Sequence, residues 1–593
     1  MVNELHAIHD ELTALGDTGT WGDTRARRVT AGRMRALSGA VDQPLRADLR
    51  LGATLVLPHL VADEAAAAAD ALIRLSPVPT VSASWLDYHR RFTARYGPGT
   101  LVPLADVVHS ATGLGFPAHF TQSPAPRHVS ARDEALLTWA GQAALDGARE
   151  IVLDSVLDLP APEGAAMQRP VSAVSLWADL RAASPEAITR GDFRLGVVGF
   201  GRIAAGTGRF LDLLNEEDQR PNSAHGAWLP ATEGALLAQL SFPPRHPRSE
   251  NVLRVPPVLP YVIPLAEHRE AADEIIPVTD LALTADTTRL YVVSRSRRRV
   301  VEAVVPHARA RHTMPPLARL IFEIPRSVHP QVTAFDWGTA ACLPYRPRLR
   351  YGRSILAPAQ WRLNPADLPG PDASTSTWDK VLDQVRERQG LPLWIAVGAG
   401  DHQLRLDLDE PMDHALLRSH LKAADRPITL SAAPRADEYG WAGGRAHEIV
   451  VPLTATAPPD PAPLALTGPA PLPVADPGDG SGVVYVKLYG PPQTFDTVLT
   501  QHLPALLQQW GTAPRWWFAR YHHPGPHLRL RLHDADRERA AGRIAAWADG
   551  LRQASLVGEI AFDAYRPETG RYGTPVRRWR RPRPCSPPTP PPS

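Results

Sequence analysis

The sequence predicts an α+β protein, with a multi-unit first domain followed by a smaller, strand-rich α+β domain. Its 593 residues suffice for about three to five folding units, if an ordinary domain has roughly 150 residues. Helical patterns fill the first part of the chain, and short strand patterns between Pro- and Gly-rich turns follow from about residue 190. No regular alternation of strand and helix is visible, which favours α+β over a doubly wound sheet.

Three helices are predicted early in the chain. In the first, apolar residues recur every three or four positions, at Leu5, Ile8, Leu12 and Leu15. The second, over 63–75, is rich in alanine and acidic at its start, as suits a helix N-terminus. The third, over 84–96, places aromatic residues on one face, namely Trp85, Tyr88, Phe92 and Tyr96. We interpret this aromatic face as core rather than as a ligand-binding surface.

The later part of the chain carries strand patterns and a clear boundary. Strands are predicted over 193–200, 281–283, 290–294, 395–397 and 404–408. Residues 458–482 have no hydrophobic period and are rich in Pro and Gly, which predicts an extended linker. We therefore expect a first domain over 1–455, a linker over 456–482, a second domain over 483–573 and a disordered basic, proline-rich tail over 574–593.

Composition and charge exclude several classes of protein. A formal net charge of +2 argues against a surface that binds nucleic acid throughout, although it permits a local basic patch. The two cysteines, Cys342 and Cys585, exclude a disulfide scaffold and an all-cysteine zinc site within one chain, and we expect no bound metal or cofactor. The polar, acidic start carries no secretory signal, and no apolar run approaches the roughly 18 residues of a membrane span. A cytoplasmic protein without membrane insertion is expected.

One glycine motif suggests a nicotinamide cofactor, and we interpret it differently. The segment LGVVGFGRIAAG places Gly199, Gly201 and Ala204 in the spacing of a dinucleotide-binding turn. That motif requires a second strand ending in an acidic residue about 20 residues later. Here the continuation is polar and broken by proline, so a structural glycine turn is predicted.

The most informative stretch is RWWFARYHHPGPHLRLRLH, residues 515–533. Its second half alternates strictly, so one face of a strand would carry leucine and the other would carry His527, Arg529, Arg531 and His533. Guanidinium groups match carboxylate or phosphate oxygens, and histidine moves protons near neutral pH. Spacing alone also fits a solvent-facing edge strand in an arginine-rich chain, in which lysine stands only at positions 380, 422 and 487.

A second element lies further along the chain. In DAYRPETGRYG, Glu568 and Arg571 stand three residues apart, on one side of a turn or short helix. They form either a surface ion pair of little energetic weight or a positioned part of a site.

These segments resemble the elimination domain of the class I lanthipeptide (lantibiotic) dehydratases, also called the thiopeptide-type bacteriocin biosynthesis domain. The matching motifs in residues 484–573 are KLYG, WWFARY, HLRLR and YRPETGRYG. Upstream segments are similar to the glutamylation domain of that family, among them DYHRRFTARYG, ENVLRVPPVLPYVIPLAEHR, FDWGTAACLPYRPRLRYGRSILAPAQWRL and GWAGGRAHEIVVPL. The resemblance extends over most of the chain up to Gly573.

The resemblance implies a reaction that makes dehydroalanine and dehydrobutyrine in a ribosomally made precursor peptide. Glutamate from glutamyl-tRNA, a co-substrate, first esterifies a Ser or Thr hydroxyl, and the elimination domain then expels it. By resemblance, Arg529 and Arg531 would hold the glutamyl group and the developing enolate. Glu568 and Arg571 would complete that site, with Glu568 as proton acceptor and His527 as a weaker candidate for the same chemistry.

For the first half-reaction the best match is YRPRLRYGR, residues 345–353. Its arginines alternate, so an extended strand would present Arg346, Arg348 and Arg350 on one face, suited to a polyphosphate backbone. A proline-punctuated basic surface strand is the alternative. Resemblance makes Arg348 and Arg350 candidates for handling glutamyl-tRNA, and Arg254 lies in another matching motif without an assigned role.

Two departures from the family pattern qualify the expected activity. The match begins well inside the family's glutamylation domain and stops at Gly573, before a histidine that serves the family as acid or base, so the chain resembles a fragment incomplete at both ends. The first hypothesis is a dehydratase-type protein, whose partners include the precursor peptide, glutamyl-tRNA, a lanthionine cyclase and a second copy of the chain. The alternatives are an inactive fragment and a non-catalytic scaffold protein that binds the precursor peptide.

Overall fold

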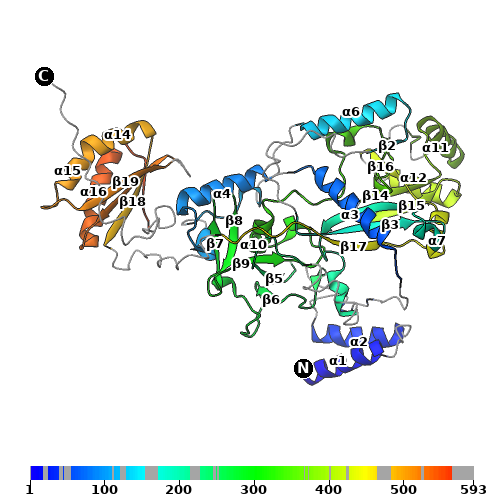
Figure 1. Ribbon diagram of the computed structural model, residues 1–593, viewed down its shortest axis with the longest axis horizontal. Helices are drawn as coiled ribbons and strands as arrows, with labels where there is room; N and C mark the ends of the chain where they lie inside the picture. Colours follow the sequence, from blue (N-terminus) through cyan, green and yellow to red (C-terminus); the bar gives the residue numbers. More distant parts are fainter. Residues whose placement is uncertain are drawn as a thin grey trace.

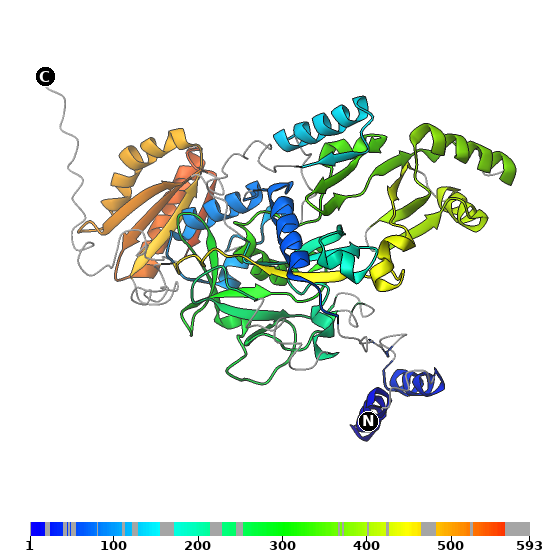
Figure 2. The same cartoon turned by 45° about the vertical axis from the view of Figure 1, so that its right-hand side comes forward.

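The computed structural model describes residues 2–17, 24–38, 44–45, 48, 55–79, 81–109, 113–120, 129–153, 171–213, 228–244, 249, 253–365, 368–370, 373–399, 402–422, 426–463, 482–521 and 526–563. Within these residues, three sheets and their helices precede residue 464, and a fourth sheet with its own helices follows Gly482. Figures 1 and 2 both show the fourth sheet as a separate lobe at one end of the molecule. Mixed sheets and helices without a βα repeat confirm the α+β prediction.

Two helices begin the described chain. They are α1 (Val2–Asp17) and α2 (Thr24–Leu37), which lie against each other apart from the sheets (Figure 1). Arg33 of α2 contacts Glu4 of α1 at 2.7 Å and also pairs with Glu11. These ion pairs link the two helices.

The first sheet lies in the middle of the molecule, in the order β17-β3-β4-β12-β11-β2. Its strands are β17 (Ile449–Thr454), β3 (Ala173–Arg181), β4 (Arg194–Arg202), β12 (Ser354–Ala357), β11 (Arg348–Tyr351) and β2 (Glu150–Val152). The helices that belong to this part are α3 (His59–Arg74), α6 (Ala131–Leu145) and α7 (Pro185–Thr189). Four alanines of α3, which are Ala65, Ala68, Ala69 and Ala71, are buried against the sheet because a side chain of one carbon allows close approach. The predicted helix over 63–75 and strand over 193–200 are confirmed as α3 and β4.

The second sheet has the order β1-β7-β8-β9-β5-β6. Its strands are β1 (Val102–Pro103), β7 (Leu281–Ala285), β8 (Leu290–Ser294), β9 (Arg299–Val304), β5 (Leu236–Ser241) and β6 (Tyr261–Pro264). They pack with α4 (Ala83–Tyr96), α5 (Leu104–Val108) and α10 (Pro316–Glu323) around one core. The aromatic face of α4 is buried in that core, from Trp85 at 7% exposure to Phe92 at 0%. The prediction that this face is core is confirmed.

The third sheet has the order β10-β13-β16-β14-β15. Its strands are β10 (Tyr345–Arg346), β13 (Gln360–Leu363), β16 (Ile428–Ala432), β14 (Trp394–Ala399) and β15 (His402–Asp407). The helices α11 (Thr375–Gln389) and α12 (Pro411–Lys422) pack on it. Strands predicted over 395–397 and 404–408 correspond to β14 and β15.

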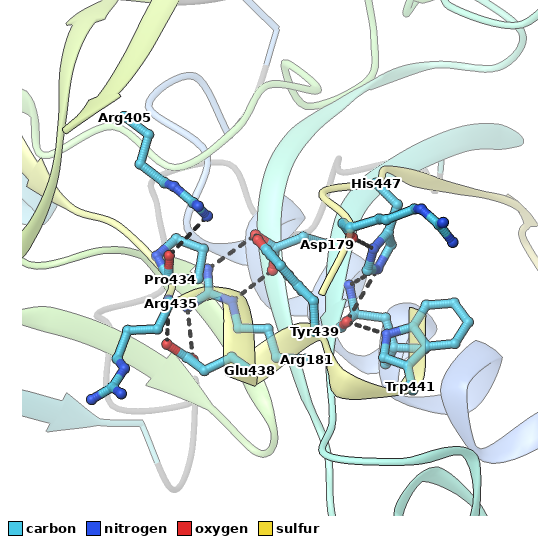
Figure 3. A network of polar contacts seen from close by, with 11 residues as sticks. Asp179, Arg181, Arg405, Pro434, Arg435, Glu438, Tyr439, Trp441 and His447 are labelled. Atoms are coloured by element: carbon cyan, nitrogen blue, oxygen red, sulfur yellow. Dashed lines mark hydrogen bonds and ion pairs between the residues drawn. The ribbon is translucent and has the colours of Figure 1, made fainter. Parts of the chain in front are cut away.

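A polar network fixes the end of β3 to the 3₁₀ helix over Ala436–Ala442, as Figure 3 shows. Arg181 Nε donates to Asp179 Oδ1 at 2.7 Å, and the Tyr439 hydroxyl donates to Asp179 Oδ2 at 2.9 Å. Trp441 Nε1 donates to the Leu180 carbonyl at 2.7 Å. Gly196 on β4 lies so close that an added Cβ would stand 2.3 Å from Asp179 Oδ1. This network is structural, because each buried polar group in it has a partner.

The fourth sheet has the order β19-β20-β18-β21 and is antiparallel. Its strands are β19 (Arg515–Tyr521), β20 (His527–His533), β18 (Val483–Tyr489) and β21 (Glu559–Asp563). Its helices are α14 (Phe495–Thr497), α15 (Leu503–Leu507) and α16 (Arg537–Gln553), with a π-helical turn over Val498–His502 between α14 and α15. The leucines of β20 and the valines of β18 pack on these helices.

The start of the predicted linker is held against the first part of the chain. Asp460 pairs with Arg289 at 3.4 Å, and its backbone bonds with Ala231 and Glu233. Residues 464–481 of the linker and all of the tail over 574–593 lie outside the described residues.

Candidate functional site

The pairing register of the fourth sheet gathers polar and aromatic side chains on one face, opposite the leucine face. Strand residues alternate between faces, so cross-strand partners share a face. Three rows cross all four strands, namely Trp517–Arg531–Tyr485–Asp563, Ala519–Arg529–Lys487–Ala561 and Tyr521–His527–Tyr489–Glu559. We call this surface the cationic face. Its middle row has small residues at both ends, so Arg529 and Lys487 stand between alanines and are framed by aromatic rings.

The basic side chains of this face are buried. Lys487 is 4% exposed, Arg529 3%, Arg531 6% and His527 0%. Strand β20 lies between β19 and β18, so the alternative of a solvent-facing edge strand is wrong. Burying cations away from water is costly unless anions compensate them. Asp563 and Glu559 are the acidic residues that the register of the described strands places on this face.

Arg529 is fixed in an orientation that suits an oxyanion. Its Nε donates to His527 Nε2 at 3.0 Å, and its guanidinium lies over the Tyr521 ring, 3.5 Å from the ring centre. Within the described part of the chain, its two terminal nitrogens make no hydrogen bond. His527 itself stacks between the rings of Tyr489 and Tyr521. The fork is therefore held at Nε, and its terminal donors remain for a carboxylate.

Arg531 and Lys487 flank the phenol ring of Tyr485. The Arg531 guanidinium lies 5.0 Å from the centre of that ring and Lys487 Nζ lies 5.5 Å from it. Burial raises the pKa of Tyr485, so its phenol stays protonated. Burial lowers the pKa of Lys487, and the charges of Arg95 and Arg529 act in the same direction, against the carboxylate of Asp563, to which Lys487 Nζ donates.

The structure therefore brings together the predicted residues Arg529, Arg531 and His527. Glu568 and Arg571 lie outside the described residues, so their predicted place beside these arginines remains a prediction. The sequence analysis did not select Lys487, although it stands between tyrosines in the alternating segment VVYVKLY. That alternation, combined with the rarity of lysine in this chain, was the available signal.

A second polar region lies in the first part of the chain, in a cavity of about 1010 Å³ that we call the central pocket. It is lined by residues of β3, β4, β9 and α10, and by Trp85 of α4. The charged residues among its lining are five arginines and three glutamates, namely Arg202, Arg309, Arg311, Arg319, Arg326, Glu302, Glu323 and Glu448. The pocket thus has an excess of positive charge.

The arginines of the central pocket are held by backbone carbonyls and aromatic rings, and Arg319 also pairs with Glu323 at 2.7 Å. Arg202 donates to the carbonyls of His307 and Arg309 at 3.0 and 3.1 Å, and its buried Nε has no partner among the described residues. Arg202 and Arg326 both lie over the Phe322 ring. Burial lowers the pKa of each to about 10, and the charge of Arg311 adds to this effect for both, whereas Glu302 and Glu323 oppose it for Arg326. Cations placed in this way favour an anionic ligand.

The glycine motif lines this pocket and has no dinucleotide-binding geometry. Gly199 and Gly201 belong to β4, which continues into turns and a 3₁₀ helix instead of an α-helix. A Cβ at either position would lie 3.3–3.4 Å from Trp177. These glycines have a structural role, since they accommodate the indole ring of Trp177, but the predicted turn is wrong at Gly199 and Gly201, because both lie within strand β4.

The prediction of one basic face over residues 346–350 is wrong. Pro347 divides the segment between two sheets, with Arg346 in β10 of the third sheet and Arg348 in β11 of the first. Arg346 is 3% exposed and donates to the Ala341 carbonyl. Burial lowers the pKa of Arg346.

The other two arginines of this segment share one carboxylate. Arg348 and Arg350 contact Glu150 Oε1 at 2.8 and 3.0 Å, and both lower the pKa of that carboxyl group, against its burial. Arg348 is half-exposed. Arg254 lies exposed between β5 and β6. The predicted tRNA-handling residues are thus spread over separate elements.

Comparison with known proteins identifies the family. A model described as the lantibiotic dehydratase N terminus matches residues 1–417, and one described as the lantibiotic biosynthesis dehydratase C-term matches residues 484–577. The chain belongs to the lantibiotic dehydratase family. This confirms the resemblance found in the sequence.

The individual relatives have low sequence identity to this chain. The chain is 23% identical over 409 residues to the epidermin biosynthesis protein EpiB of Staphylococcus epidermidis, covering 67% of this chain and 39% of EpiB. It is 23% identical over 543 residues to the subtilin biosynthesis protein SpaB of Bacillus subtilis, covering 83% of this chain and 50% of SpaB. Among solved structures, the tRNA-dependent lantibiotic dehydratase MibB from Microbispora sp. 107891 is similar, with a TM-score of 0.76 and 29% identity. That match covers 97% of this chain and 56% of MibB, so the chain spans about half the length of these relatives.

Proposed function

We propose that this lantibiotic dehydratase family member acts on a ribosomally made precursor peptide and takes part in its tRNA-dependent dehydration at Ser and Thr. The observation that carries the proposal is the buried cationic face with a fixed guanidinium fork at Arg529. Membership of the family and similarity to MibB, which is tRNA-dependent, support it further. Glutamyl-tRNA is the proposed co-substrate.

The cationic face suits elimination of glutamate from a glutamylated side chain. A base removes the peptide α-proton, the Cα=Cβ double bond forms and the Cβ–O bond breaks, so that its electron pair leaves on the glutamate carboxylate. Negative charge develops on the peptide carbonyl and on the departing carboxylate, and fixed cations in a water-poor site stabilise both. We assign these two tasks to Arg529 and Arg531, with His527 as the residue that orients Arg529. Glu568 as proton acceptor and Arg571 as its neighbour complete the proposed site.

The central pocket suits the preceding step, in which the glutamyl group is transferred from tRNA. Phosphate and carboxylate oxygens both require cationic partners, and the pocket supplies an excess of arginine. We propose that the acceptor end of glutamyl-tRNA lies there. Arg254, Arg346, Arg348 and Arg350 remain proposed contacts of the tRNA outside the pocket.

A reconstituted reaction tests the proposal. The chain would be incubated with precursor peptide, tRNA, glutamate and glutamyl-tRNA synthetase, and the peptide would be weighed by mass spectrometry. We expect a glutamyl adduct followed by loss of water, relative to a reaction without tRNA. A peptide of unchanged mass would refute the proposal, and tight binding of the leader peptide in the same preparation would then favour the scaffold alternative.

Domain limits, partners and location form the rest of the proposal. We propose that residues 1–455 and 483–573 act as glutamylation and elimination domains, joined by a linker over 456–482. A lanthionine cyclase and a second copy of the chain are proposed partners, and the cytoplasm is the proposed location. Among the described helices, none has the length and apolar composition that a bilayer crossing requires.

A further inference from the structure

Tyr485 lies on the central strand β18 of the fourth sheet, and the elimination steps proposed above give it no role. In the strand register it stands directly opposite Arg531 of β20 and opposite Asp563 of β21. The Arg531 guanidinium and Lys487 Nζ lie 5.0 and 5.5 Å from the centre of its ring. The phenol is therefore held between two cationic side chains, in the row next to that of Arg529.

The hydroxyl of Tyr485 is a hydrogen-bond donor without an acceptor. The residue is 6% exposed, so little water reaches it. Within the described part of the chain, this hydroxyl makes no hydrogen bond. Buried polar groups in folded proteins nearly always have a partner, and leaving one unpaired costs free energy. A ligand that brings an acceptor oxygen to this face would satisfy the hydroxyl.

The protonation state of Tyr485 makes it a donor and not a base. Burial raises its pKa above the usual value, and the carboxylate of Asp563 acts in the same direction. The charges of Arg529, Arg531 and Arg95 oppose this rise without cancelling it. At neutral pH the phenol is thus uncharged and keeps its proton, within the electric field of the two guanidinium groups of β20.

The two other tyrosines of the cationic face are engaged through their rings. The Tyr521 ring lies under the guanidinium of Arg529, and the Tyr489 ring stacks on His527. Both are only partly buried, so water competes for their hydroxyl groups. Tyr485 is the more deeply buried phenol, and a hydrogen bond to its hydroxyl is correspondingly stronger.

We propose that the Tyr485 hydroxyl donates a hydrogen bond to the peptide carbonyl oxygen of the glutamylated residue during elimination. The inference rests on the proposed function, because it adds a catalytic residue to the same site. As the base removes the α-proton, the electron pair of the Cα–H bond moves onto the carbonyl oxygen, and the phenol stabilises this oxyanion while it keeps its own proton. The pair then returns to form the Cα=Cβ bond, and the Cβ–O bond breaks with its electrons leaving on glutamate. A single O–H donor suits one carbonyl oxygen, whereas a guanidinium fork suits the two oxygens of the departing carboxylate.

Tyr485→Phe tests the inference, because it removes the hydroxyl and keeps the ring that packs beside Arg531 and Lys487. The substrate is a peptide with a synthetic glutamyl ester on serine, under single-turnover conditions with the full chain in excess. We expect the saturated rate of dehydroalanine formation to fall by about 10²–10³, as for the loss of one oxyanion donor. The half-saturating concentration of the chain should stay unchanged, since the bond strengthens only in the transition state. Tyr351→Phe makes the same chemical change beside the core of the first sheet and should react like the wild type.

Deuterium uptake at Cα identifies the oxygen that the hydroxyl contacts. In D₂O, unreacted ester recovered from Tyr485→Phe should carry no more deuterium than ester from the wild type, because removal of the α-proton is itself slowed. Deuterium that accumulates in the recovered ester would show that departure of glutamate is slowed instead, and it would overturn the inference. A rate for Tyr485→Phe within twofold of the wild type would also overturn it and leave the proposed function standing. A wild type that forms no dehydroalanine from the ester would refute the proposed elimination activity together with the inference.

Discussion

Replacing Arg529 by lysine should slow glutamate elimination while the charge of the site is kept. In the structure, Arg529 uses Nε to contact His527 and stacks its plane on Tyr521, which leaves two parallel donors for one carboxylate. Lysine has no planar fork and cannot make the Nε contact while it holds a ligand. The substitution also removes the hydrogen bond that Arg529 Nε donates to the buried His527.

The expected decrease in the elimination rate follows from the number of fixed hydrogen-bond donors that the substitution removes. Removing one preorganised donor from an oxyanion site costs about 10²–10³ in rate, or roughly 2.7–4 kcal/mol of transition-state stabilisation. Arg529→Lys keeps the electrostatic attraction, so we expect a rate about 10² below the wild type. Arg529→Met loses the charge as well and should fall by about 10³.

The assay uses a peptide that carries a synthetic glutamyl ester on serine, so that only the second half-reaction is measured. Release of glutamate and formation of dehydroalanine would be followed by mass spectrometry under single-turnover conditions. Arg520→Met is the matched control, because Arg520 lies on β19 with its side chain on the opposite face, paired with Asp496. Rates within twofold of the wild type for both Arg529 variants would refute the role of the fork.

Three further results are expected. Gly196→Ala should lower the free energy of unfolding by about 1–3 kcal/mol in denaturant titrations, because the new Cβ would stand 2.3 Å from Asp179 Oδ1 and must displace it; unchanged stability would contradict this close approach. Burial lowers the pKa of His307 to about 4, so between pH 6.5 and 4 the unfolded chain binds a proton that the folded chain does not. The free energy of unfolding should therefore fall by about 3 kcal/mol as the pH drops through that range. His307→Asn should abolish this part of the pH dependence in thermal unfolding scans. Arg348→Ala should weaken tRNA binding and reduce the slope of log affinity against log salt by about 0.9 in filter-binding assays, and an unchanged slope would show that this arginine does not contact phosphate.

Local patterns in the sequence predicted single elements well. The 3.6-residue period identified α4 and the alternation of HLRLRLH identified β20, because each pattern records which side chains of one element face the core. The leucine side of β20 was predicted from alternation alone, and it packs in the core of the fourth sheet. What these patterns record is burial within one element.

The prediction failed where neighbouring residues belong to different sheets. Arginine does recur at every second position in YRPRLRYGR, but at Pro347 the chain passes from the third sheet to the first. The partner of Arg348 and Arg350 is Glu150, about two hundred positions away, on a strand that pairs with β11 in parallel. No local pattern encodes such a partner, since parallel pairing is set by the whole sheet.

Which residues lie on the cationic face also depends on how the strands of the sheet are aligned. Lys487 lies beside Arg529 only because β18 pairs with β20 in one particular alignment, and a shift of one residue would turn Lys487 to the leucine face. Arg95 joins them through packing between lobes, a level of organisation above the sheet. The alternating pattern of each strand could therefore be read from the sequence, whereas the proximity of the residues in the proposed anion site could not.

Helix α4 gives this proximity a further consequence, because its two ends lie at the two proposed sites. Trp85 near its start lines the central pocket, and Arg95 near its end contacts the cationic face. Ten residues of α-helix span about 15 Å, so the helix holds the two regions at a fixed separation of that order along its axis. In the proposed sequence of reactions the glutamyl group is first bonded to the peptide and later released. Glutamate that is esterified to a Ser or Thr side chain can reach the cationic face only together with that side chain. The peptide itself must therefore move from the central pocket to the cationic face. Two anion sites that are separated by a rigid helix thus require a mobile substrate segment, which an extended, unfolded precursor peptide supplies.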